Sequence, residues 1–209
     1  MRKHIGEVLP RHKKTPNKRF AIAGGIFLIG LMVLSSLAFI LDNYSQPDNT
    51  VTYENYTFLP VNSVWKTTLQ EKDVIFNYLP DSVESVEVGS APQIIQTSRV
   101  LWITYDPHAE YADVMGGIQY ADDHLLYDLK GIYVQRGLVN NSAFPELPQI
   151  GCNNATASEP VLLLTQTNDT NKVGLRTEGT CITITCQFGD DFQRYNERIL
   201  YTLLGVITR

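Results

Sequence analysis

Cysteine, histidine and carboxylate side chains are the groups in this sequence whose types and spacing could support chemistry. Three cysteines, Cys152, Cys181 and Cys186, stand in the C-terminal third. In the run Cys-Ile-Thr-Ile-Thr-Cys, positions 181 and 186 differ by an odd number, so on one regular strand they face opposite sides and cannot bond. Cys152 lies on a predicted loop that can reach the strand. We therefore predict a Cys152–Cys181 disulfide, which would add on the order of 3 kcal/mol by chain entropy.

The thiol of Cys186, the cysteine left over, has two interpretations. A reactive thiol needs a basic neighbour that lowers its pKa, and no His, Lys or Arg adjoins Cys186 in the sequence. A buried structural thiol needs no such neighbour. We predict the buried thiol and keep thiol redox chemistry as the alternative.

A metal site can be drawn from His108 and Glu110, which follow a predicted strand, and from Asp122, Asp123 and His124 on the helix predicted after it. The same residues equally well form a turn, a helix start and a solvated helix face. A ligand set also needs converging geometry, so we predict no metal site. The sequence has no Gly-x-Ser-x-Gly setting and no glycine-rich phosphate loop. We therefore predict no catalytic residue, no cofactor and no small-molecule ligand.

Five Asn-x-Ser/Thr sequons indicate a chain that lies outside the cytoplasm in a cell that glycosylates proteins. We predict that some of them carry glycan. They begin at Asn43, Asn55, Asn140, Asn154 and Asn168.

The net charge of −5 is unevenly distributed along the chain. Residues 1–19 hold seven Lys and Arg against Glu7, a charge of +6, which leaves −11 for residues 20–209. An acidic domain lacks the cations that nonspecific binding to nucleic acid requires, so no nucleic-acid partner is expected for the larger part. The basic tail suits anionic lipid or RNA.

Residues 20–41 contain no charged side chain and are long enough, at 1.5 Å per residue, to cross the ~30 Å hydrocarbon layer. Basic residues precede this segment and Asp42 and Asp48 follow it, so the positive-inside rule places residues 1–19 in the cytoplasm and the rest outside. We predict a single-pass cell-membrane protein anchored in the lipid bilayer, a tether over 42–50, and an extracytoplasmic domain over 51–209. A cleavable signal peptide ending near Ser36-Leu37-Ala38 is the alternative.

The predicted outer domain begins with strand-like segments and continues with a β-α-β unit. Aromatic and β-branched residues alternate in part over 52–80, which predicts an antiparallel meander. Residues 99–105 form an apolar run typical of a buried strand, and apolar side chains then recur at helical spacing through residues 110–131, with Gly131 at the C-cap position. Residues 131–139 predict the next strand, parallel to the first.

The C-terminal part is predicted as three strands and a closing helix. A long loop over 140–159 leads to strands near 160–167, 173–179 and 181–186, which suggest an antiparallel edge. An amphipathic helix over 188–208 follows, with Phe192 and Ile199 on its apolar face. We expect Arg194, Glu197 and Arg198 to stay in water.

The fold class is therefore α/β, with α+β as the alternative, and the core order β-α-β-β-β-α matches a thioredoxin-like fold. Pro160 stands where that fold keeps a cis proline. The Cys-x-x-Cys motif of that fold is missing after the first strand, where Asp106-Pro107-His108-Ala109-Glu110 stands instead.

The chain resembles a set of uncharacterised archaeal single-pass membrane proteins with an extracytoplasmic α/β domain. The resemblance spans most of the chain and implies membrane anchoring and the Cys152–Cys181 bridge, without an activity. Besides the basic tail, the apolar helix and a Tyr-Thr-Phe strand, it rests on Phe76-Asn77-Tyr78-Leu79-Pro80, Thr104-Tyr105-Asp106-Pro107, Cys152-Asn153-Asn154-Ala155-Thr156, Cys181-Ile182 and Glu197-Arg198-Ile199-Leu200-Tyr201.

Two functions are consistent with these features. The first is a noncatalytic binding or envelope-assembly module with a protein partner in the envelope, which predicts an exposed apolar patch of several hundred Å². The alternative is a thiol-redox or metal-dependent envelope enzyme on a thioredoxin-like frame, which requires Cys186, or His108 with nearby carboxylates, to converge in a pocket.

Overall fold

The computed structural model describes residues 27–36 and 50–208, and the chain divides into two units, Met1–Asp48 and Asn49–Arg209. Residues 27–36 form a helix whose large apolar side chains are exposed. Among the described residues, no helix is long and apolar enough to cross a membrane. The predicted tail 1–19 lies outside the described residues. The described residues include only 27–36 of the predicted span 20–41 and only residue 50 of the predicted tether 42–50.

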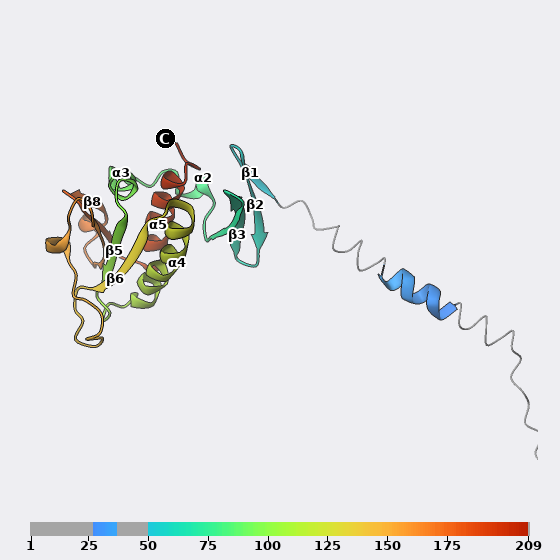
Figure 1. Cartoon of the computed structure of the whole chain (residues 1–209), viewed down its shortest axis with the longest axis horizontal. Coiled ribbons are helices and arrows are strands. Elements are labelled where there is room, and N and C mark those ends of the chain that lie inside the picture. The colour runs from blue at the N-terminus through green and yellow to red at the C-terminus, as the bar shows by residue number, and fades with distance from the viewer. Residues whose placement is uncertain (1–26, 37–49, 209) are drawn as a thin grey trace, which may run out of the picture. The chain divides into compact units, whose positions relative to one another are not determined.

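The second unit is a mixed α/β structure with two sheets (Figure 1), as the sequence predicts at the level of fold class. The first sheet is an antiparallel meander in chain order, joined by two-residue turns at 54–55, 62–63 and 70–71. Its inward side chains include Phe58, Val74 and Phe76, which are buried. The predicted meander is confirmed, and its strands are β1 (Val51–Tyr53), β2 (Tyr56–Val61), β3 (Val64–Leu69) and β4 (Lys72–Phe76).

The second sheet has five strands in the order β6-β5-β7-β9-β8. β5 pairs in parallel with both β6 and β7, β7 pairs in parallel with β9, and only the edge strand β8 is antiparallel. The predicted parallel pair around a helix is confirmed. The strands are β5 (Val100–Tyr105), β6 (Tyr133–Leu138), β7 (Val161–Gln166), β8 (Gly174–Glu178) and β9 (Cys181–Cys186).

The thioredoxin-like expectation is wrong in the number of strands and in the direction of one of them. The observed order β5-α4-β6-β7-β8-β9-α5 has four strands after α4, whereas β-α-β-β-β-α has three. A thioredoxin-like sheet has its third strand antiparallel to the first, whereas β7 runs parallel to β5. Residues 139–160 join β6 to β7 and are long enough to return to the opposite end of the sheet. β7 therefore starts at the same end as β5 and runs parallel to it, and not antiparallel as in a thioredoxin-like sheet. No peptide bond in the described residues is cis, so the expected cis bond at Pro160 is not formed.

Two long helices lie against one face of the second sheet, between it and the meander (Figure 1). They are α4 (Ala112–Lys130), which ends at Gly131 in the left-handed conformation, and α5 (Gly189–Leu203). Ile103, Ile184 and Met115 belong to the buried cluster between sheet and helices, and Tyr201 extends that cluster to the meander by packing on Phe76. One continuous core therefore joins both sheets.

Four shorter helical segments complete the unit. The sequence did not predict α2 (Pro80–Val83) or α3 (Ala91–Gln96), which both pack on α5. The 3-10 turns are η1 (Cys152–Asn154) and η2 (Thr170–Lys172). The opposite face of the second sheet carries Trp102 and Thr104, and the Thr104 hydroxyl donates to the carbonyl of Ile150 in the long loop. That loop therefore covers part of the face that the helices leave free.

Candidate functional site

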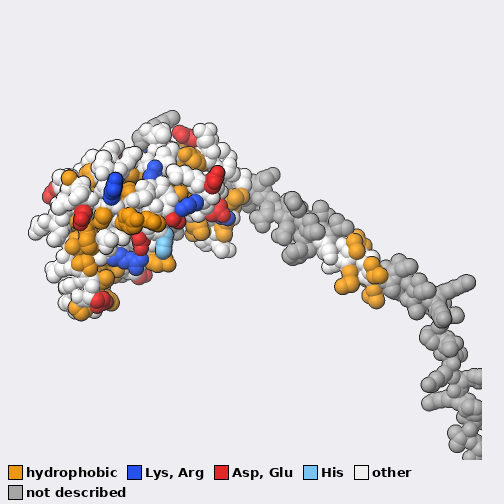
Figure 2. Space-filling view, in the orientation of Figure 1, with side chains coloured by type: hydrophobic (Ala, Val, Ile, Leu, Met, Phe, Trp, Pro, Cys, Tyr) orange, Lys and Arg blue, Asp and Glu red, His pale blue; other side chains and the backbone are white. Residues whose placement is uncertain are grey.

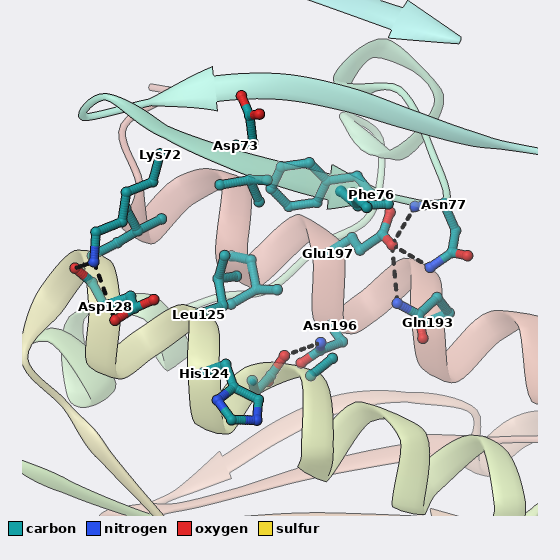
Figure 3. A pocket seen from close by; sticks show the side chains of 16 residues that line it. Lys72, Asp73, Phe76, Asn77, His124, Leu125, Asp128, Gln193, Asn196 and Glu197 are labelled. Carbon is teal, nitrogen blue, oxygen red and sulfur yellow. Dashed lines mark hydrogen bonds and ion pairs between the residues drawn. The ribbon is translucent and has the colours of Figure 1, made fainter. Parts of the chain in front are cut away.

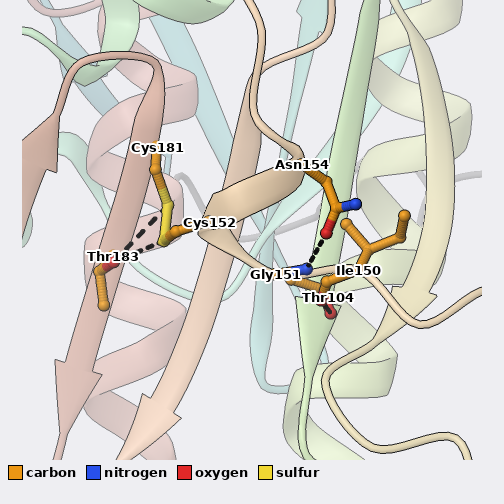
Figure 4. The surroundings of a disulfide bond; sticks show 7 residues. All are labelled: Thr104, Ile150, Gly151, Cys152, Asn154, Cys181 and Thr183. Carbon is orange, nitrogen blue, oxygen red and sulfur yellow. Dashed lines mark hydrogen bonds between the residues drawn. A yellow bond between two sulfur atoms is a disulfide. The ribbon is translucent and has the colours of Figure 1, made fainter.

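The predicted disulfide between Cys152 and Cys181 is present, with the two Cα atoms 5.3 Å apart (Figure 4). η1 positions Cys152 over the start of β9, and the Thr183 hydroxyl lies 3.8 and 3.9 Å from the two sulfurs. Cys181 and Thr183 share one face of β9, while Cys186 belongs to the core on the other. The alternation of side-chain direction along β9 thus places Cys181, and not Cys186, on the face that Cys152 reaches.

The Cys186 thiol is fully buried. Burial raises its pKa to about 12, and the negative charge of Asp191 acts in the same direction. A thiol with that pKa is almost wholly protonated at neutral pH, and the thiolate is the form that reacts. The prediction of a buried cysteine is confirmed, and the redox alternative loses its candidate nucleophile.

The five candidate metal ligands are distributed over separate places. His108 lines a hollow at the carboxyl ends of the parallel strands, and Glu110 there exchanges two hydrogen bonds with Gln166. Asp123 forms an ion pair with Arg136 on the outer side of α4. Within residues 27–36 and 50–208, no group of three or more His, Cys, Asp or Glu is placed to hold a metal ion.

Four of the five sequon asparagines, Asn55, Asn140, Asn154 and Asn168, have exposed side chains, and Asn43 lies outside the described residues. Asn55 stands on the β1–β2 turn, and the Asn154 side chain accepts a hydrogen bond from Gly151 through its Oδ1 (Figure 4). Glycosylation of these sites stays a prediction.

An exposed surface on α4 and β6, here called the aromatic surface, consists of Tyr120, His124, Tyr127, Tyr133 and Arg136. The three tyrosines are 60%, 50% and 53% exposed. Tyr127 and Tyr133 lie with ring centroids 4.9 Å apart, and the Arg136 guanidinium lies 5.6 Å from the Tyr120 ring. Figure 2 shows hydrophobic side chains gathered beside basic ones over this part of the molecule. Tyr and Arg are, with Trp, enriched among the residues that carry most of the binding energy at protein interfaces.

The aromatic surface adjoins an unpaired sheet edge, because β6 is the outermost strand. The Tyr133 amide donates to Arg99 in the neighbouring segment, and along a strand the direction of successive backbone groups alternates. The backbone N–H and C=O groups of Val134 and Arg136 therefore point outward. At Leu138 this outer side is already occupied, since Leu138 and the loop residues Pro148 and Ile150 exchange two hydrogen bonds.

A cavity of about 300 Å³, here called the α4–α5 cavity, lies between β4 and the two long helices (Figure 3). Glu197 brings a buried carboxyl to its wall and is 1% exposed. Its Oε1 accepts hydrogen bonds from the backbone and side-chain nitrogens of Asn77 and from Gln193, and its Oε2 accepts one from the Tyr78 amide, all within 2.7–2.9 Å. Burial raises the pKa of Glu197 while these four bonds oppose the rise.

Asp122 on α4 lines the same cavity and is 2% exposed. Its Oδ1 accepts a 3.0 Å hydrogen bond from Asn196 Nδ2 on α5, which links the two helices (Figure 3). Burial raises the Asp122 pKa to about 7, the Asn196 bond lowers it, and the charge of Glu197 raises it. The Asn196 Oδ1 atom is buried without a hydrogen-bond partner in the described protein.

The expectation that Glu197 and Arg198 stay in water is wrong, since both are buried, and Asp122 does not lie on a solvated helix face. Both carboxyl groups are buried because of their positions along the helices. Asp122 follows the buried Ile118 by four residues, and Glu197 precedes the buried Tyr201 by four, so each belongs to a core-facing stripe. The helical period places both residues on the core side of their helices, whereas their charged residue type favours a solvated position.

These features define a mixed α/β domain with a disulfide-tied sheet, an exposed aromatic surface and a cavity lined by two buried carboxyl groups. Comparisons of the chain with protein-family models, with curated proteins and with solved structures find no match.

Proposed function

We propose that the chain is a membrane-anchored extracytoplasmic protein whose outer domain is a noncatalytic binding or envelope-assembly module. Residues 20–41 are its anchor in the lipid bilayer, as the charge-free apolar run and the charges on either side of it suggest. The Cys152–Cys181 disulfide supports an oxidising compartment outside the cytoplasm. The resemblance to archaeal single-pass membrane proteins is in line with this location.

The observation that carries the binding function is the aromatic surface beside the open edge of β6. Tyrosine side chains that stay half exposed on α4 and β6 offer a large contact area at a low entropic cost. The outward backbone groups of Val134 and Arg136 offer hydrogen bonds to an added strand. We infer that the partner contributes an extended segment that pairs with β6 and packs its side chains on Tyr127 and Tyr133.

Site-specific photocrosslinking of the full chain in native membranes tests this function. A photoreactive phenylalanine analogue in place of Tyr133 should give one discrete crosslinked band. The matched control is the same analogue in place of Phe188, which is 57% exposed and stands at the N-cap of α5, away from β6. A band from position 133 with none from position 188 is the expected result.

Two substitutions at Arg136 show whether the partner pairs with the edge itself. Arg136→Pro removes the outward N–H and blocks an added strand, while the bonds from β6 to β5 remain, because they come from the neighbouring residues. Arg136→Ala removes only the side chain. The crosslink at Tyr133 should be lost in the proline variant and retained in the alanine variant. Equal bands in all three proteins would refute strand addition.

A further inference from the structure

The α4–α5 cavity combines apolar walls with buried negative charge. The apolar part of its lining includes Val74 and Phe76 from β4, Leu125 from α4 and Leu200 from α5. Asp122 and Glu197 bring two carboxyl groups to the same lining, both nearly inaccessible to water. A cavity of about 300 Å³ is at the lower end of the range for small-molecule sites.

Among the described residues, the two carboxyl groups have no cationic partner. In the described part of the chain, neither Asp122 nor Glu197 takes part in an ion pair, although buried charges in proteins are normally paired. Lys72 lines the cavity but forms an ion pair with Asp128, with both side chains about half exposed. When Asp122 is ionised, no cation in the described chain therefore neutralises its charge.

One hydrogen-bond acceptor at the cavity wall also lacks a donor among the described residues. The two oxygens of Glu197 already accept four bonds. Asn196 is 2% exposed, its Nδ2 is used by Asp122, and its Oδ1 is an acceptor without a donor in the protein. A ligand that fits here must donate a hydrogen bond to the Asp122 carboxylate, and a small shift of the Asn196 side chain would bring its unpartnered Oδ1 within reach of the same donor group.

From this geometry we propose that the α4–α5 cavity binds a small primary ammonium ion with an apolar chain, held at its charged end by Asp122 and Asn196. The N–H groups of the ammonium are donors only, which matches two acceptors. The apolar chain packs against Phe76 and Leu125. This proposal goes beyond the proposed function, which concerns the outer side of α4 and the edge of β6; His124 belongs to both linings.

Calorimetric titration of the full chain in detergent tests the site, with n-hexylammonium as the probe and hexan-1-ol as its neutral control. Hexylammonium should bind at least about tenfold more tightly at pH 8 than hexan-1-ol, because a charged donor gains more from a buried acceptor. At pH 6.5 the affinity should fall, since the ammonium must displace a proton from Asp122. The other ionisable groups lining the cavity are Lys72, Asp73, His124, Asp128 and Glu197.

Proton release gives a second readout that needs no variant. Titrations at pH 7 in two buffers of different ionisation enthalpy should differ in heat, because bound ammonium forces the carboxyl to ionise. Asp122→Asn should lower hexylammonium affinity at least about tenfold and abolish the difference between buffers. Equal affinity for hexan-1-ol and hexylammonium, or no saturable binding of hexylammonium at pH 8, would overturn the proposal.

Discussion

The hydroxyl group of Tyr201 donates a 2.6 Å hydrogen bond to the backbone carbonyl of Tyr78. Tyr201 lies on α5, and Tyr78 belongs to the segment that leaves the meander. The Tyr201 ring also contacts the rings of Phe58 and Phe76, and burial raises the pKa of its hydroxyl. One side chain therefore fastens the meander to the helix layer through both packing and a polar bond.

Replacing Tyr201 separates these two contributions. Tyr201→Phe should lower the free energy of unfolding by about 1 kcal/mol, because only the hydrogen bond is lost. Tyr201→Ala should cost about 3–5 kcal/mol, because a large cavity forms in the core. Urea unfolding followed by circular dichroism measures both values. Similar losses in the two variants would mean that the ring contributes little.

Glu197→Gln should destabilise the fold by about 2–4 kcal/mol. The Glu197 carboxylate accepts four hydrogen bonds, and a neutral amide would place its own two N–H donors among these four donors. The matched control is Glu178→Gln on the edge strand β8, an exposed position that should change stability by less than about 0.5 kcal/mol. Chemical unfolding of both variants at pH 7 gives the comparison. A Glu197 variant as stable as the control would refute the role of this network.

Because Asp122 is buried, the free energy of unfolding should fall as pH rises. The folded-state pKa of Asp122, about 7, lies above the ordinary value of 3.8, so the folded protein binds the extra proton between these values. The stabilising contribution is fully present below pH 4 and is lost as pH rises through 7. Relative to Asp122→Asn, the unmodified protein should lose on the order of 3 kcal/mol between pH 5 and pH 8. Parallel pH profiles of the two proteins would contradict this.

Removal of the disulfide should lower stability by about 3–4 kcal/mol, because the bridge closes a loop of 29 residues in the unfolded chain. Cys152→Ser and Cys181→Ser should behave alike, and reductant should have no further effect on either. Thermal or urea unfolding with and without reductant provides the measurement. Unequal losses in the two variants would indicate that one serine causes damage of its own.

Cys186 should resist alkylation in the folded protein. The thiol is buried and its pKa is raised to about 12, so little thiolate is available to iodoacetamide at pH 8. Mass spectrometry should show labelling of this cysteine only after unfolding. Fast labelling of the native protein would return the redox alternative to consideration.

Local patterns in the sequence predicted the elements better than their arrangement. The apolar run before Asp106 and the helical spacing up to Gly131 identified β5 and α4, because those signals are local. The direction of β7 depends on how the loop after β6 closes, and no residue in that loop encodes it alone. α3 escaped prediction because its six residues are too few to show a period.

The candidate site was less predictable for a related reason. Glu197 is buried because Asn77 and Tyr78, 120 and 119 residues earlier, supply its donors. A single sequence does not show such distant pairing, so a charged residue on a helix was expected in water. The disulfide was predictable because the alternation along β9 is a short-range property.

The Cys152–Cys181 bond closes a covalent ring that contains the whole of β7 and β8. Exposed turn residues such as Asn168 and Lys172 lie inside this ring, and exposed turns are preferred sites of cleavage by proteases. A single cut there opens the ring but releases no fragment, because the sulfur bridge still joins the two pieces. After such a nick, the halves remain attached and the sheet can stay assembled in a hydrolytic environment.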